Sequence, residues 1–232
     1  MADIQYQLML NMLEAHPGQS ILDVGCGTGY GLLFCQQKGM QVTGIDPSPY
    51  MLDIAGKVLG NRADLHRGTA EALPFDDNSF NYALLITCLE FVHDPRKALE
   101  ETFRVAKDKV FIGIINRYAA NRNKIRFKGL FTETAFNNAH FYSIWDIKKI
   151  ILDLLGDIPF QWQNISLYPP ASGKLGKKVA NSQLAQKFPF GTYIGITATL
   201  MPRFRTRPLE LKICPEHNKG AVPGLSSGQS GP

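Results

Sequence analysis

The residue types that most clearly suggest chemistry lie in the segment Asp23-Val24-Gly25-Cys26-Gly27-Thr28-Gly29. An apolar run precedes it and a helical pattern follows, as expected where a parallel β-strand turns into a helix. Three glycines at alternate positions let the backbone approach a bound molecule closely, and the unpaired N–H groups at the start of the helix can donate hydrogen bonds to it. The segment therefore predicts a small-ligand site. A glycine turn without a ligand is the structural alternative.

A second acidic residue, Asp46, follows the predicted strand 41–45 and stands 21 residues after Gly25. Because ligands of open α/β sheets lie outside the carboxyl ends of the strands, both segments are expected to line one crevice. A carboxylate at this place can accept hydrogen bonds from two ribose hydroxyls, which favours a nucleoside ligand. Alternatively, Asp46 caps the helix predicted to begin at Pro47, and the two roles are compatible.

The glycine spacing separates two classes of nucleoside site. Dinucleotide-binding folds use G-x-G-x-x-G, whose third glycine allows close packing of the helix on the strand. Gly25 and Gly27 fit that pattern, but Tyr30 occupies the third glycine position and Gly29 precedes it. A nicotinamide-dependent oxidoreductase is therefore a disfavoured alternative.

Two further segments accompany the glycine loop. The first is Gly68-Thr69-Ala70-Glu71-Ala72-Leu73-Pro74-Phe75, which leads to Asp77-Asn78-Ser79-Phe80, and the second is Leu89-Glu90-Phe91-Val92-His93-Asp94. With the glycine loop, and in the same order, they resemble motifs of class I S-adenosylmethionine (SAM) dependent methyltransferases, in particular the family that includes ubiquinone and menaquinone biosynthesis enzymes. The resemblance covers residues 18–116, and it departs from the family pattern at Thr69 and Asn81, where aspartate is usual, and at Phe91, where histidine is usual.

The resemblance implies a methyltransferase that uses SAM and releases S-adenosylhomocysteine (SAH), with the 68–75 segment beside the adenine. Thr69 implies that the contact to the adenine amino group is weaker or made by the backbone, and Asn81 is expected to alter only the support of the strand 80–87. Phe91 removes any chemical role of the family's histidine. The residues expected to bind the cofactor are Asp23, Gly25, Cys26, Gly27, Gly29, Asp46, Pro47, Thr69, Ala70, Glu71 and Thr87.

Three side chains are candidates for a catalytic base or for a contact to the acceptor. Methyl transfer can proceed largely by positioning, and a base is needed only where the nucleophile must lose a proton early. The candidates are His140, His93 and Tyr142; the alternatives are an ordinary loop histidine, a residue at a helix start and an aromatic packing residue. Cys214 and His217 lack the further ligands that a metal site needs, so no metal is expected.

Basic residues cluster in two segments of a chain whose net charge is +5. Residues 117–142 hold five basic residues against one glutamate, and residues 169–189 hold four lysines and no acid, so each carries +4. The tail from Met201 adds +3, which leaves −6 for the rest. If these insertions cover the crevice, they recruit an anionic small-molecule acceptor, with Arg122, Lys124, Arg126 and His140 as substrate-binding residues. A solvated loop face is the alternative.

A different class of function is a module that binds SAM or a nucleic acid on the same fold and transfers nothing. Basic residues interleaved with Phe127 suit a nucleic acid, as in Arg122, Lys124, Arg126 and Lys128. No recognised RNA- or DNA-reading motif accompanies them, so nucleic acid is the weaker interpretation.

The alternation of elements predicts the fold. We expect helices at 4–15, 30–38, 47–58, 95–106 and 144–155, and strands at 20–24, 41–45, 63–67, 80–87, 110–115, 160–167 and 190–200. This pattern is typical of an α/β, doubly wound, mostly parallel seven-stranded Rossmann-like sheet. The last two strands have no full helix between them, which predicts an antiparallel last strand, as in the class I methyltransferase fold. That strand could lie at a sheet edge and pair across a dimer, but the sequence leaves the oligomeric state open.

The 232 residues are expected to form one methyltransferase domain over 1–201, with the insertions 117–142 and 169–189 as a substrate-side lid. The Pro-, Gly- and Ser-rich tail 202–232 is expected to be disordered. No apolar run approaches the roughly 20 residues of a membrane span, and no signal-peptide pattern occurs. The four cysteines, Cys26, Cys35, Cys88 and Cys214, form no C-x-x-C pair, which favours reduced thiols and a cytoplasmic location.

Overall fold

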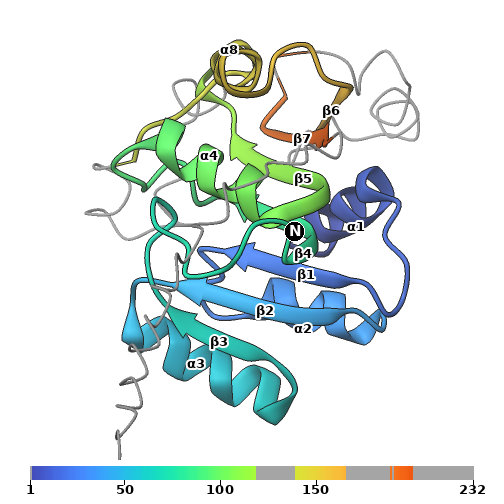
Figure 1. Ribbon diagram of the computed structural model, residues 1–232, viewed down its shortest axis with the longest axis vertical. Helices are drawn as coiled ribbons and strands as arrows, with labels where there is room; N and C mark the ends of the chain where they lie inside the picture. The colour runs from blue at the N-terminus through green and yellow to red at the C-terminus, as the bar shows by residue number, and fades with distance from the viewer. Residues whose placement is uncertain (1, 119–138, 166–188, 190, 201–232) are drawn as a thin grey trace, which may run out of the picture. The chain divides into compact units, whose positions relative to one another are not determined.

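The computed structural model describes residues 2–118, 139–165, 189 and 191–200 (Figure 1). The insertion residues 119–138 and most of 169–189, together with the tail 202–232, lie outside the described residues. The helices are α1 (Ala2–Leu13), α2 (Tyr30–Gln37), α3 (Pro49–Leu59), the 3-10 turn η1 (Gly60–Arg62), α4 (Pro95–Val105) and α8 (Ile144–Leu155). The strands are β1 (Ser20–Val24), β2 (Gln41–Asp46), β3 (Asp64–Arg67), β4 (Phe80–Ile86), β5 (Ala106–Ile115), β6 (Phe160–Ile165) and β7 (Tyr193–Thr199).

The seven strands form one sheet in the order β3-β2-β1-β4-β5-β7-β6. Neighbours pair in parallel from β3 to β5, and β7 runs antiparallel to both β5 and β6. The register sets Asp23 of β1 opposite Gly44 of β2 and Leu84 of β4. The predicted doubly wound sheet with an antiparallel last strand is therefore confirmed.

The last strand does not lie at an edge of this sheet. Six of its seven residues are buried, because β5 and β6 flank it on both sides. The possibility that this strand pairs across a dimer edge is therefore wrong. The edge strands of the described sheet are β3 and β6.

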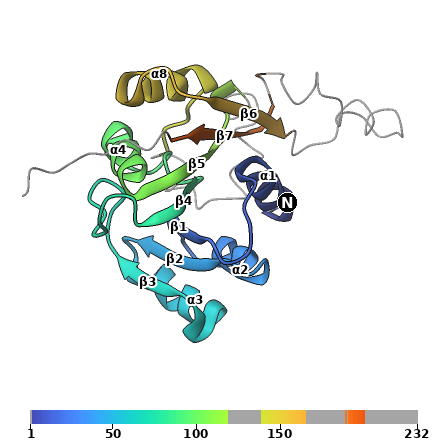
Figure 2. The same ribbon diagram turned by 45° about the vertical axis from the view of Figure 1, so that its right-hand side comes forward.

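Helices cover both faces of the sheet (Figure 2). Each face has its own apolar cluster. One cluster joins Met9 of α1, Cys35 of α2 and Leu59 of α3 to one face. The other joins Leu99 of α4 and Ile147 of α8 to the opposite face. Strands covered on both sides read as nearly continuous apolar runs, which explains the composition of residues 110–115. The sandwich leaves the carboxyl ends of the strands free to carry loops.

The helix starts are set by side-chain caps, and one differs from the prediction. Helix α3 begins at Pro49 rather than at Pro47, because the Ser48 hydroxyl accepts the N–H of Met51 at 3.3 Å and makes Ser48 the N-cap. Ser143 caps α8, at the start of the predicted helix 144–155, in a reciprocal capping box with Asp146. No loop residue separates α4 from β5, because the strand begins at Ala106, directly after the helix, and not at residue 110 as predicted.

Candidate functional site

Loops at the carboxyl ends of β1, β2, β3 and β4 enclose a cavity of about 620 Å³. This volume lies within the roughly 300–1,000 Å³ of small-molecule sites. Its lining includes eight of the eleven residues expected to bind a cofactor, namely Gly25, Gly27, Asp46, Pro47, Thr69, Ala70, Glu71 and Thr87, and also the candidate His93. It also includes six that the sequence did not single out for this role: Ser48, Met51, Gly68, Cys88, Phe91 and Val92. Asp23, Cys26 and Gly29 do not line it.

The glycine loop after β1 is shaped by its backbone and by close neighbours. Gly25 has a φ of +75° and Gly27 a φ of +53°. Residues other than glycine rarely adopt this backbone conformation. A Cβ atom on Gly25 would lie 2.5 Å from Sγ of Cys88, so this position also needs glycine for space. The carbonyl of Ile45 accepts the N–H of Gly25 at 2.7 Å and that of Cys26 at 3.1 Å. The loop is therefore held against the end of β2.

The carboxylate of Asp46 is fixed at the cavity by two backbone donors. Its Oδ2 accepts the N–H of Gly27 at 2.9 Å, and its Oδ1 accepts the N–H of Ser48 at 2.9 Å. The N-cap role suggested for Asp46 belongs instead to Ser48. Each carboxylate oxygen keeps a second lone pair, so the group can still accept hydrogen bonds from a ligand.

Asp23 lies behind the glycine loop, on the face of the sheet that α1 and α2 cover. It is 5% exposed, and its Oδ1 has no hydrogen-bond partner among the described residues. Burial, and next the charge of Asp46, raise the pKa of Asp23 to about 7. A Cβ atom on Gly31 would lie 3.2 Å from its Oδ2, so the start of α2 packs closely on the carboxylate. A buried carboxylate without a partner is suited to a cation or a hydrogen-bond donor.

Glu71 joins the two loops that follow β3 and β4. Its Oε1 accepts the N–H of His93 at 2.9 Å and that of Asp94 at 3.4 Å. The Asp94 carboxylate in turn accepts the N–H of Lys97 at 3.0 Å and caps α4. The backbone of His93 is therefore held by Glu71, while its exposed side chain lies at the cavity.

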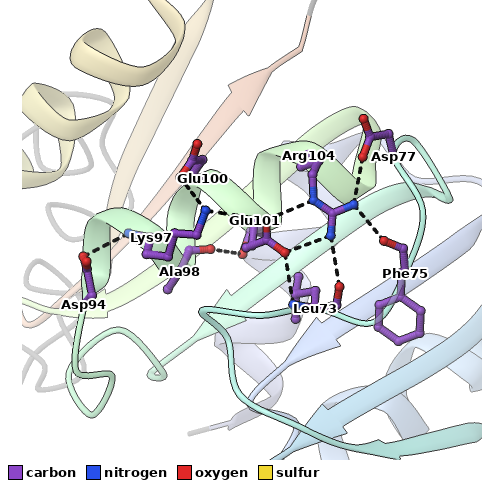
Figure 3. Close-up of polar contacts among 10 residues, drawn as sticks. Leu73, Phe75, Asp77, Asp94, Lys97, Ala98, Glu100, Glu101 and Arg104 are labelled. Atoms are coloured by element: carbon purple, nitrogen blue, oxygen red, sulfur yellow. Dashed lines mark hydrogen bonds and ion pairs between the residues drawn. The ribbon is translucent and has the colours of Figure 1, made fainter. Parts of the chain in front are cut away.

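Arg104 of α4 holds the loop that continues from Glu71 (Figure 3). Its Nη1 donates to the Phe75 carbonyl at 2.7 Å and to Asp77 at 2.8 Å, and its Nη2 donates to the Leu73 carbonyl at 3.0 Å. The Glu101 carboxylate accepts hydrogen bonds from Nη2 of Arg104 at 2.8 Å and from the N–H of Leu73 at 3.1 Å. One guanidinium thus fixes three residues of the loop. The sequence did not single out Arg104, because two of its four partners are backbone carbonyls and Asp77 lies 27 residues away in the chain.

A residue with a strained backbone follows directly after β4 and lines the cavity. Thr87 has a φ of +52°, a rare conformation for a β-branched side chain, and its N–H donates to the Gly113 carbonyl at 2.7 Å. Backbone strain of this kind costs on the order of 1–3 kcal/mol and is common at ligand sites. The turn directs residues 88–93 back across the cavity.

Asn81, where the family usually has aspartate, joins three strands away from the cavity. Its Oδ1 accepts the N–H and the hydroxyl of Ser20, each at 3.1 Å, and its Nδ2 donates to Asp108 at 2.8 Å. These contacts agree with the expected role in strand support. An aspartate at this position would face Asp108 without a donor.

Three of the six predicted acceptor-side residues are described: His93 lines the cavity, whereas His140 and Tyr142 do not. His140 is exposed, and its N–H donates to the Glu90 carbonyl at 2.8 Å. Tyr142 is half-buried against the core, forms a bridge with Asn116, and its carbonyl accepts the N–H of Arg117 at 2.9 Å. The remaining three, Arg122, Lys124 and Arg126, lie outside the described residues.

Within the described residues there is no group of three metal-ligating side chains and no helix long and apolar enough to cross a membrane. Cys26, Cys35 and Cys88 are free thiols. Burial raises the pKa of each thiol, so they remain protonated at neutral pH. The site is therefore made of backbone donors, carboxylates and apolar side chains.

Comparison with known proteins relates this site to a family. The family described as "Methyltransferase domain" matches residues 22–113. A demethylmenaquinone methyltransferase of Renibacterium salmoninarum is 40% identical over 101 residues, which are 44% of this chain and 42% of that protein. An uncharacterised protein of Methanocaldococcus jannaschii is 32% identical over 162 residues, 66% of this chain and 72% of that protein.

The fold has matches among solved structures. A SAM-dependent methyltransferase of Thermotoga maritima, described as a possible histamine N-methyltransferase, matches with a TM-score of 0.62 and 24% identity, over 84% of this chain and 88% of that one. Its likeness supports the sheet order and the antiparallel β7. By its motifs, its fold and these relatives, the chain belongs to the class I SAM-dependent methyltransferase family.

Proposed function

We propose that the protein transfers the methyl group of SAM to a small-molecule acceptor by in-line displacement, and that the acceptor is anionic. The observation that carries the first part is the carboxylate of Asp46, held at the cavity by the N–H groups of Gly27 and Ser48. Its free lone pairs are available to the two ribose hydroxyls of an adenosyl group. The family membership supports the same donor.

The residues around the cavity fit the other parts of SAM. The backbone of Thr69 and Ala70 is available to the adenine edge, and Met51 and Phe91 offer apolar surface to its ring. Asp23 does not line the cavity, so we assign it no direct contact with SAM. When bound, SAM supplies an electrophilic methyl group on a sulfonium. The protein's contribution is to orient both molecules and exclude water.

The two ends of the first basic insertion support its role near the acceptor. The N–H of Arg117 donates to the Tyr142 carbonyl, and Nε of Arg117 donates to the Phe141 carbonyl at 2.8 Å, so the departing and returning chains lie together. The returning chain also donates a hydrogen bond to the carbonyl of Glu90, the residue before Phe91 of the cavity lining. The described chain ends that flank the insertion, residues 118 and 139, therefore lie on the side of Glu90, which supports assigning Arg122, Lys124 and Arg126 to the acceptor.

The acidic wall of the cavity favours the first basic insertion, residues 117–142, as the part of the protein that binds an anionic acceptor. The described lining residues include Asp46 and Glu71 and no lysine or arginine. A negative group on the acceptor would be repelled by this wall and attracted by an insertion with net charge +4. The matched family region ends at residue 113, before the insertion, so the acceptors of the curated relatives are no guide here.

Calorimetric titration of the purified protein with SAM, SAH and NAD tests the donor. Micromolar binding of both adenosyl ligands and no binding of NAD is expected. NAD binding without SAH binding would contradict the proposal and favour an oxidoreductase.

A screen of anionic small molecules for SAH production then tests the acceptor. With the best acceptor found, the triple variant R122Q/K124Q/R126Q is expected to raise KM for that acceptor and to leave the SAM dissociation constant unchanged. The control K57Q/K107Q/K149Q removes the same charge from exposed lysines elsewhere. An unchanged KM in the first variant, or an equal rise in both, removes the role of the insertion.

A further inference from the structure

Helix α8 carries large apolar side chains on its outer face as well as on its inner face. Ile144, Ile147 and Ile151 are buried in the cluster that joins the helix to the sheet. On the outer face, Trp145 is 56% exposed and Leu152 is 42% exposed. A surface helix typically has charged and polar residues on the face opposite its buried stripe. The outer face of α8 therefore has the composition of a contact surface rather than that of a solvated one.

The exposed residues of this face form one stripe along the helix. Lys149 follows Trp145 by four residues and precedes Leu152 by three, and this spacing places the three side chains on one face. Lys148 is also exposed and adjoins them. The two apolar side chains thus stand two helical turns apart, with two lysines between them. We call Trp145, Lys148, Lys149 and Leu152 the α8 stripe.

Both acidic residues of α8 are paired with arginines outside the stripe. The carboxylate of Asp146 forms an ion pair with Arg117 at 3.2 Å, and that of Asp153 forms one with Arg96 at 3.5 Å. Each pair is electrically neutral as a whole. The outer face of the helix therefore has the charge of its two lysines.

Neither lysine of the stripe is neutralised by a carboxylate of the described residues. The ammonium of Lys148 lies 5.6 Å from the centroid of the Phe160 ring, a cation–π contact that leaves its charge uncompensated. Lys149 is exposed and has no ion pair with a described residue. The methylene groups of a lysine can lie along apolar surface while its ammonium stays in water. Both side chains are thus suited to the border between an apolar and an anionic layer.

These properties favour one kind of partner, a lipid surface with acidic headgroups. Tryptophan prefers the boundary between an apolar and a polar layer, and lysines beside apolar residues on one helix are typical of helices that bind anionic bilayers. A second copy of this chain fits poorly, because a twofold interface would set the lysines of one stripe against those of the other. A nucleic acid would leave Leu152 without an apolar partner.

The stripe begins at the end of the sheet that carries the cavity. Tyr142, just before α8, forms a bridge with Asn116, just after β5. The ion pair of Arg117 with Asp146 holds the first turn of the helix at the same place. Because β5 is parallel to β4, its carboxyl end lies at the edge of the sheet from which the cavity loops leave. Trp145, in the first turn of α8, is therefore on this side of the molecule.

We propose that the α8 stripe docks on an anionic lipid surface, with Trp145 and Leu152 in the apolar layer and Lys148 and Lys149 at the headgroups. The helix lies on the bilayer, since its 12 residues are fewer than the roughly 20 that a span requires. Binding of this kind is peripheral and reversible, and it depends on the acidic lipids. It goes beyond methyl transfer and does not depend on the identity of the acceptor.

Co-sedimentation of the purified full chain with vesicles tests this surface. One set of vesicles is made of phosphatidylcholine alone, and the other contains about 40% phosphatidylglycerol, measured at about 0.1 M salt. The wild type is expected to bind the anionic vesicles at least about tenfold more tightly than the neutral ones. Lys148→Gln/Lys149→Gln and Trp145→Ser/Leu152→Ser are each expected to weaken binding to the anionic vesicles at least about tenfold.

Matched controls change the same kinds of residue elsewhere. Lys57→Gln/Lys107→Gln removes two exposed lysines, and Ile4→Ser removes an apolar side chain that is 56% exposed, as Trp145 is. Both controls are expected to bind the anionic vesicles within about threefold of the wild type. Near-ultraviolet circular dichroism shows whether each variant is folded.

Tryptophan fluorescence is a second route that uses the wild type itself. The chain has two tryptophans, and Trp162 is half-buried in β6. Anionic vesicles are expected to shift the emission of the wild type to shorter wavelength, and Trp145→Phe, which keeps Trp162, is expected to lose the shift.

The docking proposal is overturned if the wild type binds neither kind of vesicle, or binds both equally. It is also overturned if the stripe variants and the controls lose binding to the same extent, or if the emission is unchanged by anionic vesicles. Binding of a generic oligonucleotide without binding of anionic vesicles would assign the stripe to nucleic acid instead.

Discussion

The Asp46 carboxylate and the Gly27 N–H are joined by a hydrogen bond of 2.9 Å, which connects the ends of β2 and β1 at the cavity. The same carboxylate receives the N–H of Ser48, at the start of α3. One side chain thus fixes the glycine loop and the next helix relative to each other. It also keeps its remaining lone pairs at a constant position for a ligand.

Replacing Asp46 tests this relationship directly. Asp46→Ala removes the acceptor for two backbone donors and for the ribose, and each charge-assisted hydrogen bond to a ligand is worth about 1.5–3 kcal/mol. We expect SAH affinity, measured by calorimetry, to fall at least about tenfold. Asp53→Ala, an exposed position on α3, is the matched control and should bind normally. Normal SAH binding by Asp46→Ala would exclude the ribose contact.

Arg104→Met is expected to weaken both the fold and the cofactor site. It leaves the carbonyls of Leu73 and Phe75 without their donor and removes the guanidinium from the carboxylates of Glu101 and Asp77, which costs about 2–4 kcal/mol of unfolding free energy. The loop 68–77 should loosen, and SAH affinity should fall with it. Urea unfolding and calorimetry measure the two effects.

The control for Arg104 is Arg96→Met on the same helix. The ion pair of Arg96 with Asp153 is about half exposed on both sides, so its loss should change stability by less than about 1 kcal/mol. If Arg104→Met loses stability but binds SAH as the wild type does, the loop does not depend on Arg104 for its binding geometry.

Asp23 predicts a pH dependence of stability whose sign follows from burial. Its pKa is raised from 3.8 to about 7 in the folded protein, so between these values the folded state holds a proton that the unfolded chain has lost. The unfolding free energy of the wild type therefore falls as the pH rises from about 4 to 7, and above pH 7 Asp23 causes no further change. The unfolding free energy of Asp23→Asn minus that of the wild type should rise over this range. A difference that is flat from pH 4.5 to 8 would show that Asp23 is ionised throughout.

Asn81→Asp is expected to destabilise the protein at neutral pH. The substitution removes the Nδ2 donor to Asp108, 2.8 Å away, and sets two carboxylates against each other. We expect a loss of about 1–3 kcal/mol of unfolding free energy. Adding Asp108→Asn should recover much of this loss, because the donor and the acceptor are then exchanged. A double variant no more stable than Asn81→Asp would rule out this pair as the cause.

Local patterns in the sequence predict the strands, helices and loops that depend on near neighbours in the chain. The periodic apolar runs locate β1 to β5, and the three glycines locate the turn after β1, because φ near +75° at Gly25 requires glycine. Ser143 could be identified as a cap because its partner Asp146 is three residues away. The start of α3 was misplaced by two residues, since Pro47 and Pro49 both suit a first turn and only the Ser48 cap separates them.

The sequence by itself determined the glycine loop, Asp46, the 68–71 segment and the alternation that makes a doubly wound sheet, since each depends on residue type and short spacing. Tertiary structure alone decided that β7 lies inside the sheet and that Arg104 holds the carbonyls of Leu73 and Phe75. The physical reason is distance along the chain. Hydrogen bonds to backbone carbonyls leave no pattern in side-chain types, and the place of β7 between β5 and β6 depends on pairing between strands far apart in the chain.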